Sequence, residues 1–354
     1  MVLTLNIKDL LRDLSMAPGV SGFEYSVSEV IKRALNGVVD SISEDALGNI
    51  IAVKDGGGPS IMVAAHLDEI GLMVKHVDDK GFIRFAKLGG VPDHVLLGQV
   101  VSIHTPKGRV RGVIGCKAIH VMKEDERSKL VTYDKMFIDI GAKNAQEVKE
   151  LGITVGTPIT IDKGLIELRN NMVSGKAFDD RAGCTALIEA LRASKPRNKV
   201  YAVFTIQEEV GLRGATVSAY TVNPRLGLAV DVTIAGDHPE IPEQEAPIKV
   251  GAGPVIVAAD GRRDSLGGGL IVNPKVRSWL ISLAEKSGIP YQLEVLEGGT
   301  TDATAIQLSR GGVPCGVIAI PTRYTHSFNE VISLNDLENA AKLIRASLES
   351  ELLV

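Results

Sequence analysis

Apolar residues in the first part of the chain are spaced first as in helices and then as in strands. Residues 5–16 and 25–38 place apolar side chains three and four positions apart, which predicts two amphipathic helices. The stretch APGVSGFE at 17–24 lies between them and is rich in turn-forming residues. Continuous apolar runs at 46–54 and 60–71 follow and predict strands. The chain therefore opens as a mixed α/β structure.

The pattern changes between residues 72 and 164. Short alternating runs are separated by turn sequences such as DDKG and TPKG, with no convincing helix between most of them. The charged stretch KEDERSK at 123–129 is interpreted as a solvated loop. Closely spaced strands of this kind predict a small antiparallel β-barrel or sandwich. The predicted strands lie at 72–77, 82–88, 100–105, 109–115, 136–141 and 157–162.

Helices and strands alternate again after residue 165. The last predicted helix, 333–350, opens with Ser333 and Asp336 in the spacing of a capping pair. Alternation of this kind predicts a mostly parallel sheet flanked by helices, interrupted by the inserted β-rich segment. The predicted catalytic α/β domain is thus split into residues 1–71 and 165–354 around an insert at 72–164. Further helices are predicted at 182–194, 274–288 and 302–312, further strands at 200–206, 226–230, 291–296 and 315–320, and long loops with one central strand at 237–274.

Composition narrows the classes of function. The 354 residues are 45% hydrophobic and 23% charged, as in globular proteins, and the net charge of −4 argues against a nucleic-acid partner. No apolar stretch approaches the ~18 residues of a membrane span, and the charged N-terminal stretch does not resemble a secretory signal. Cys116, Cys184 and Cys315 are odd in number and widely spaced, which predicts buried free thiols in a reducing cytoplasm.

Histidines and carboxylates follow the predicted strands of the α/β domain. Sites in open α/β sheets form beyond the carboxyl ends of strands, so side chains there are expected to meet. Asp180 is interpreted as a helix cap, and each remaining signal is weak alone. Five segments that deliver an imidazole or a carboxylate to the same edge are not expected from stability alone. The candidates are His66 and Asp68, Glu208 and Glu209, Asp231, His326, and Asp179 just before a predicted helix.

These donor types suit two divalent metal ions better than one. Two imidazoles and three carboxylates, without thiolate, favour Zn²⁺, Co²⁺ or Mn²⁺. Two such ions ~3.5–4 Å apart can polarise a carbonyl and lower the pKa of a shared water. Asp68 lies two residues from His66 and can hold the ring nitrogen that does not bind metal. Because side chains of neighbouring residues on a strand diverge, one of Glu208 and Glu209 is expected to bind metal and the other to act as the base.

The motifs HLDEIG, KAFDDRAG, QEEVGLRGA, VDVT, GGTTDAT and RYTHS resemble those of the M42 family of cocatalytic metallo-aminopeptidases, whose archaeal members are the tetrahedral (TET) aminopeptidases. The resemblance covers nearly the whole chain. It implies that His66 and Asp231 bind one metal, that Glu209 and His326 bind the other, and that Asp179 bridges them. It also implies that Glu208 is the general base and Asp68 a supporting catalytic carboxylate. The sequence departs from the family pattern at Thr301, because it reads GGTTDA where many members read GGTDA or GGGTDA.

The same resemblance implies two Zn²⁺ or Co²⁺ ions per subunit and a homo-oligomer, typically a dodecamer built from dimers through the inserted β domain. The expected reaction is release of N-terminal residues from short peptides by a bridging hydroxide. Alternatives are a metal-dependent amide deacylase or carboxypeptidase, which needs a cationic anchor such as Arg213 or Arg323, and a metal-stabilised peptide-binding scaffold without turnover. The preferred N-terminal residue, the physiological metal and the role of His120 are left open by the sequence.

Overall fold

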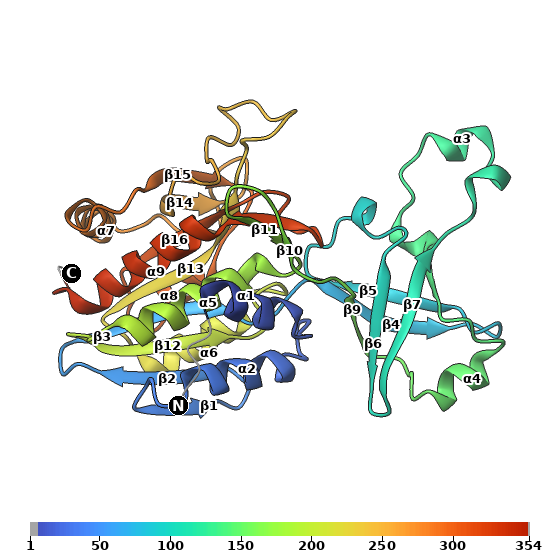
Figure 1. The fold of residues 1–354 in the computed structure, drawn as a ribbon, viewed down its shortest axis with the longest axis horizontal. Coiled ribbons are helices and arrows are strands. Elements are labelled where there is room, and N and C mark those ends of the chain that lie inside the picture. Colours follow the sequence, from blue (N-terminus) through green and yellow to red (C-terminus); the bar gives the residue numbers. More distant parts are fainter. Residues whose placement is uncertain (1–5, 353–354) are drawn as a thin grey trace.

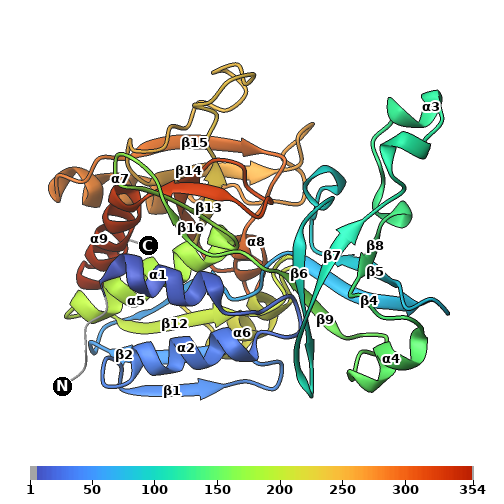
Figure 2. The same ribbon diagram turned by 45° about the vertical axis from the view of Figure 1, so that its right-hand side comes forward.

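The protein is described by a computed structural model, which covers residues 6–352. An α/β domain built on an eight-stranded sheet lies beside a closed six-stranded antiparallel barrel (Figures 1 and 2). The barrel is inserted into the α/β domain, because all of its strands lie between Gly71 and Ile161. The predicted fold class is therefore confirmed. Residues 1–5 and 353–354 of the expected domain ranges lie outside the described residues.

The large sheet has four parallel strands at its centre. In the order β1-β2-β12-β3-β13-β16-β14-β15, the pairs from β12 to β16 are parallel, so these four strands end at one edge of the sheet. Their apolar, β-branched sequences suit strands that are covered on both faces. The bounds are β1 (Ser41–Glu44), β2 (Ile50–Asp55), β3 (Ser60–His66), β12 (Lys199–Thr205), β13 (Leu226–Ile234), β14 (Val255–Gly261), β15 (Gln292–Glu297) and β16 (Cys315–Thr322).

Helices cover both faces of this sheet. The core on one face includes side chains of α1, α2, α5, α7 and α9, and the core on the other includes side chains of α6 and α8. The sequence predicted all of these helices except α6. The bounds are α1 (Ile7–Met16), α2 (Tyr25–Leu35), α5 (Phe178–Ala193), α6 (Arg213–Val222), α7 (Pro274–Lys286), α8 (Asp302–Gln307) and α9 (Leu334–Glu349).

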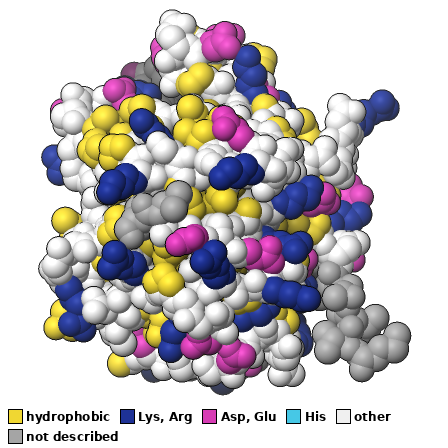
Figure 3. All heavy atoms as spheres, turned by 90° about the vertical axis from the view of Figure 1, so that its left-hand side faces the viewer, with side chains coloured by type: hydrophobic (Ala, Val, Ile, Leu, Met, Phe, Trp, Pro, Cys, Tyr) yellow, Lys and Arg dark blue, Asp and Glu magenta, His cyan; other side chains and the backbone are white. Residues whose placement is uncertain are grey.

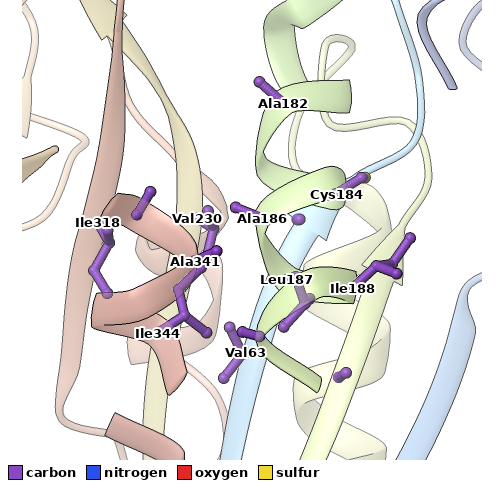
Figure 4. Packing of buried hydrophobic residues seen from close by; sticks show 14 of the residues in the cluster. Val63, Ala182, Cys184, Ala186, Leu187, Ile188, Val230, Ile318, Ala341 and Ile344 are labelled. Atoms are coloured by element: carbon purple, nitrogen blue, oxygen red, sulfur yellow. The ribbon is translucent and has the colours of Figure 1, made fainter. Parts of the chain in front are cut away.

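Helix α5 lies at the centre of the molecule. It packs against β3 and β13 on one side and against α1 and α9 on others, so nearly all of its side chains are buried. Figure 4 shows Ala186 and Leu187 of this helix close to Val63 of β3 and to Ile344 of α9. The start of this helix is also buried, and it carries Asp179.

The barrel has a hydrophobic core of its own, which includes Leu72, Val101 and Ile138. It closes in the order β4-β5-β8-β7-β6-β9, which decides between the barrel and the sandwich that the sequence left open. The expected solvated loop at 123–129 is exposed but contains one turn of helix, α3, far from the sheet (Figure 1). The bounds are β4 (Gly71–Val77), β5 (Ile83–Leu88), β6 (Val100–Thr105), β7 (Gly108–Gly115), β8 (Phe137–Asp139), β9 (Pro158–Ile161), α3 (Glu124–Arg127) and α4 (Ala145–Glu150), with 3-10 turns at Asp93–Val95, Ile119–Val121 and Tyr133–Lys135.

A small third sheet, absent from the sequence prediction, joins distant segments. It consists of β10 (Ile166–Glu167), β11 (Met172–Gly175) and β17 (Glu330–Ser333). In its antiparallel register Gly175 lies opposite Glu330. This pairing brings the segment that precedes α5 next to the segment that follows β16.

Two local predictions need correction. Ser333 does cap α9 by accepting the N–H of Asn335 at 3.2 Å, but Asp336 does not complete a capping pair. Its carboxylate instead accepts the N–H groups of Gly251 at 2.6 Å and Gly253 at 2.8 Å, because a loop packs against this turn. All three cysteines are free thiols, but Cys116 is only half-buried, since it lies at the edge of the barrel.

The outer surface of the α/β domain carries charges of both signs. Figure 3 looks at the face away from the barrel, where Lys, Arg, Asp and Glu side chains are interspersed with hydrophobic ones. Among residues 6–352, the helices are all too short or too polar to cross a lipid bilayer.

Candidate metal centre

The predicted site residues gather at the carboxyl edge of the central strands, where the chain leaves β3 for the barrel. His66 is the last residue of β3, and His326 follows β16 in a loop. Asp231 lies within β13, three residues before its end, and Glu208 and Glu209 lie in a turn beyond β12. The sequence suggested that these three carboxylates directly follow their strands. Instead, Asp231 lies inside its strand, and the two glutamates lie beyond the end of theirs. Together with Asp179, these side chains line one cavity of about 540 Å³.

Asp179 lies between the two histidines. Its Oδ1 is 3.0 Å from Nε2 of His66, and its Oδ2 is 3.3 Å from Nε2 of His326. Two groups of potential ligands share this carboxylate: one adds His66 and Asp231, the other adds Glu209 and His326. Within each group the ligand atoms all lie within 4.8 Å of one another. The geometry therefore offers two adjacent three-residue clusters with one common member.

The backbone around Asp179 departs from a regular helix. Ala177 has a left-handed conformation, and Asp179 and Asp180 have non-helical φ and ψ although α5 begins at Phe178. The Asp180 carboxylate accepts the N–H of Gly183 at 2.9 Å, as expected of a helix cap. It also accepts the N–H of His66 at 3.1 Å. Asp180 thus connects the start of α5 to the end of β3.

Glu330 was not recognised from the sequence, although it holds two of the candidate ligands. Its Oε2 accepts the N–H of Asp179 at 3.1 Å, and its Oε1 accepts the N–H of His326 at 3.0 Å. The side chain is buried, and burial raises the pKa of Glu330 well above its ordinary value, with the nearby charge of Asp179 adding to the shift. Only the pairing of β17 with β11 reveals this contact, since 151 residues separate Glu330 from Asp179.

Asp68 is fully buried and supports both His66 and the paired glutamates. The Nδ1 atom of His66 is 3.1 Å from the main-chain oxygen of Asp68 and 3.6 Å from its carboxylate, so the main chain makes the closer contact. The carboxylate accepts the N–H of Glu208 at 2.9 Å, the N–H of Glu209 at 3.2 Å and the hydroxyl of Ser21 at 2.6 Å. Burial opposes ionisation, but these contacts and His66 outweigh it and lower the pKa of Asp68.

Glu208 and Glu209 have different surroundings. The Oε2 atom of Glu209 is 3.7 Å from Nε2 of His326, and its Oε1 is buried without a hydrogen-bond partner among the described residues. Glu208 belongs to neither cluster, and its Oε2 lies 4.0 Å from Nε2 of His66. Burial raises the pKa of Glu208 well above its ordinary value and that of Glu209 to about 7, the latter assisted by the charge of Asp179.

The charge balance fits divalent cations. Burial, with Asp179 nearby, also raises the pKa of Asp231, so this cluster holds several carboxylates that need positive charge to ionise. The histidines supply it only by binding protons: burial lowers the pKa of His326, but its hydrogen bond with Asp179 outweighs burial and raises the pKa to about 10. Metal binding replaces such protons. The unpartnered oxygen of Glu209 and the nitrogen and oxygen donors therefore fit metals that prefer these ligands.

A buried ionic cluster connects the N-terminal segment to this site. The Lys176 ammonium lies 2.7 Å from the Glu69 carboxylate, which also accepts the N–H of Gly19 at 3.1 Å. Arg181, fully buried, donates to the main-chain oxygens of Leu14 and other residues of the same segment. The sequence alone does not reveal the pairing of Lys176 with Glu69, because ion pairs across 107 residues have no local signature. Together they hold Ser21 against Asp68.

Three residues whose roles the sequence did not settle, Arg213, Arg323 and His120, lie outside the cavity lining. Arg323 forms an ion pair with Asp237, with nitrogen–oxygen distances of 2.6 and 2.8 Å, and Arg213 donates to the side chain of Gln207 at 2.9 Å. His120 is exposed on the barrel side of the molecule, in a 3-10 turn. Thr301 does line the cavity, and its hydroxyl is buried without a hydrogen-bond partner among the described residues.

Comparison with known proteins places the chain in a family. The family model described as M42 glutamyl aminopeptidase matches residues 48–343. The lysyl aminopeptidase of Pyrococcus furiosus is 36% identical over 346 residues, which cover 96% of each chain.

Solved structures superpose on nearly the whole chain. Aminopeptidase APDkam598 of the archaeon Desulfurococcus kamchatkensis is 43% identical and superposes with a TM-score of 0.93, covering 98% of this chain and 95% of that one. The TET1 peptidase of Pyrococcus horikoshii, described as able to assemble into a tetrahedron or a large octahedral shell, is 34% identical. Its TM-score is 0.87, with 98% of this chain and 100% of that one covered.

Proposed function

The chain belongs to the M42 glutamyl aminopeptidase family, and we propose that this metallo-aminopeptidase releases N-terminal residues from short peptides with the help of two divalent metal ions. One observation carries the proposal: the two carboxylate oxygens of Asp179 face different histidines. Each histidine belongs to a separate cluster of nitrogen and oxygen donors. A shared carboxylate between two such clusters is the arrangement that a pair of metal ions requires.

In this proposal His66 and Asp231 would hold one ion, Glu209 and His326 would hold the other, and Asp179 would contribute to both sites. Zn²⁺ and Co²⁺ accept the same donors, so either ion fits. When bound, the ions supply Lewis-acid chemistry, in which the scissile carbonyl is polarised and the pKa of the attacking water falls toward ~7. Asp180, Asp68 and Glu330 hold these ligands through the main-chain groups of His66, Glu209, Asp179 and His326.

Glu208 is the proposed general base. It lines the cavity but belongs to neither ligand cluster, so its carboxylate is available to accept the proton of the attacking water. After the peptide bond breaks, the same carboxyl group returns that proton to the leaving amine. A base that holds the proton only between these two steps needs a pKa near the working pH, and burial shifts the pKa of Glu208 upward in this sense. Asp68 positions Glu208 by accepting its main-chain N–H.

The lining of the cavity favours an aminopeptidase over the carboxypeptidase alternative. Recognition of a substrate carboxylate requires a cationic anchor, but the described residues that line the cavity include no Lys or Arg. The two arginines considered from the sequence are engaged with Asp237 and Gln207 instead. The available Glu208 also argues against a scaffold without turnover.

Assembly is part of the proposal. The TET1 peptidase of Pyrococcus horikoshii, which matches this chain over its whole length, can assemble into closed shells. We propose a homo-oligomer, a dodecamer built from dimers, in which the barrel mediates subunit contacts. Exposed apolar side chains on the barrel side, Ile119, Val121 and Leu130, support such contacts. Light scattering of the purified protein tests the mass, and a monomer in solution would contradict this part.

A rate panel tests the reaction. Chelated protein is assayed with aminoacyl chromogenic amides and with their N-acetylated counterparts, before and after addition of Zn²⁺ or Co²⁺. Cleavage restored by metal and confined to the free-amine set is the expected result. Cleavage of the acetylated set would indicate a deacylase or an endopeptidase. No cleavage of either set, with metal bound, would favour the scaffold.

A further inference from the structure

The cavity of the proposed site has an uncharged part beyond the ligand clusters. The acidic and imidazole side chains that line it are those of the clusters and Glu208. Among the described residues, the rest of the lining has no charged side chain at all. It consists of glycines, threonines and four apolar residues, Leu212, Val232, Ile234 and Leu296.

The apolar wall is open to a ligand. Ile234, the last residue of β13, has 42% of its surface exposed. Leu296 of β15 lies under the turn at Gly298 and Gly299, and a Cβ at position 299 would lie only 3.2 Å from Cδ2 of Leu296. Glycine at this position leaves room beside Leu296, which is half-buried and lines the cavity. An apolar surface exposed inside a cavity gains free energy when an apolar group of a ligand covers it.

Among the cations on neighbouring segments, Arg262 and Arg263 follow Gly261, which pairs with Gly299, but neither lines the cavity, and two others are paired with carboxylates. Arg323 is held by both oxygens of Asp237, and Lys249 is 2.9 Å from Glu243. Neither residue lines the cavity. A glutamate or aspartate side chain in the uncharged part would lose its hydration water without gaining a cationic partner. A lysine side chain would lose its hydration water without gaining a carboxylate, because the uncharged part has none.

We propose that the enzyme prefers peptides whose N-terminal side chain is uncharged and aliphatic, such as leucine or methionine, over those with glutamate, aspartate or lysine. This preference differs from the glutamyl specificity in the family description and from the lysyl specificity in the name of the Pyrococcus furiosus relative. It rests on the proposed function, because the uncharged part is assigned to the substrate by its position beside the ligand clusters. Leu296 and Ile234 are the residues that determine the specificity.

The test for the wild type compares kcat/KM for the p-nitroanilides of leucine, methionine, glutamate and lysine, at one pH and a saturating concentration of Co²⁺ or Zn²⁺. We expect leucine to exceed glutamate and lysine by about 100-fold or more, since a buried charge without a partner is penalised more strongly than one missing methylene. Equal or faster cleavage of the glutamate or lysine substrate would overturn the preference and leave the proposed function intact. No cleavage of any substrate would overturn the proposed function, and the preference with it.

Two variants test the wall itself. Leu296→Lys places an ammonium in the uncharged part, and we expect the ratio of glutamate to leucine kcat/KM to rise at least about 10-fold. Leu293→Lys is the matched control, because Leu293 lies on the same strand with 51% of its surface exposed and does not line the cavity. Its ratio should equal that of the wild type.

A second lysine variant can replace Leu296→Lys, because a lysine at a half-buried position can prevent folding. If Leu296→Lys does not fold, Ile234→Lys at the more exposed position carries the same expectation. Leu296→Met should keep the order of substrates, because it preserves an apolar wall. A folded lysine variant at either position with an unchanged ratio would overturn the assignment of the wall.

Discussion

Glu330 gives the sharpest test of how the site is built. Each of its oxygens accepts a different main-chain N–H, that of Asp179 at 3.1 Å and that of His326 at 3.0 Å, and only 1% of the residue is exposed. In Glu330→Gln one oxygen becomes an NH₂ group, which cannot accept. One buried N–H then loses its acceptor, at a cost of about 1–3 kcal/mol. Both N–H groups belong to proposed metal ligands, so we expect metal affinity to fall about 10- to 100-fold.

The assay is a titration of metal-stripped protein with Zn²⁺ or Co²⁺ in competition with a chromophoric chelator, alongside kcat/KM at saturating metal and the free energy of unfolding. We expect the affinity to fall while most of kcat/KM returns at saturation, because Glu330 does not touch the substrate. Glu338→Gln, an exposed glutamate on α9, is the control and should match the wild type. Metal affinity within about twofold of the wild type, at any stability, would refute the reasoning that Glu330 positions these ligands.

Three other predictions follow from the site. Glu208→Gln should lower kcat by about 10²-fold or more while both metals are retained. Glu209→Gln should lose metal, as measured by metal analysis after dialysis. The reverse pattern would mean that the two roles are exchanged. Ser21→Ala removes the hydroxyl that donates to Asp68 at 2.6 Å, so kcat should fall with little change in KM, and recovery in Ser21→Thr would separate positioning from a loss of folding. Burial raises the pKa of Glu209 from 4.5 to about 7. In metal-free protein, the stabilising contribution of Glu209 to the free energy of unfolding is therefore complete below its unfolded pKa of 4.5 and is lost as the pH rises through about 7. Calorimetry should therefore show that metal-free protein loses stability between these pH values and that added Zn²⁺ stabilises it most at the higher pH; a Zn²⁺ effect independent of pH would contradict this account.

Local patterns of apolar and polar residues predict much of the fold. The apolar runs of β3, β12, β13 and β16 are continuous because these strands are covered on both faces, and the barrel strands alternate because each has one face on a core. Such periodicities predicted most of the observed strands and helices. Helix α6 was missed because it follows directly after QEEVGL and buries only small residues, Gly214, Ala215, Ser218 and Ala219, so its apolar period is weak.

The sequence indicated which residues belong to the candidate site, but not how they lie relative to one another. The sequence selected four of the candidates because parallel strands end at one edge of a sheet and Asp179 because it precedes a predicted helix. The structure does bring together His66, Asp179, Glu209, Asp231 and His326. The roles proposed for them still await the experiments above. Their relative placement depends on loops whose conformations have no periodic signal, such as the turn that carries Glu208 and Glu209 beyond the end of β12.

The sequence by itself determined most of the elements, the insertion of a β-rich segment and the residue types available for metal, because these follow from side chains a few positions apart. Only the tertiary structure decided that β17 pairs with β11 and places Glu330 behind Asp179, and that Lys176 binds Glu69. It alone decided that no Lys or Arg of the described residues lines the cavity. These contacts join residues that are more than a hundred positions apart, and their free energy arises only when the chain has folded and excluded water between them.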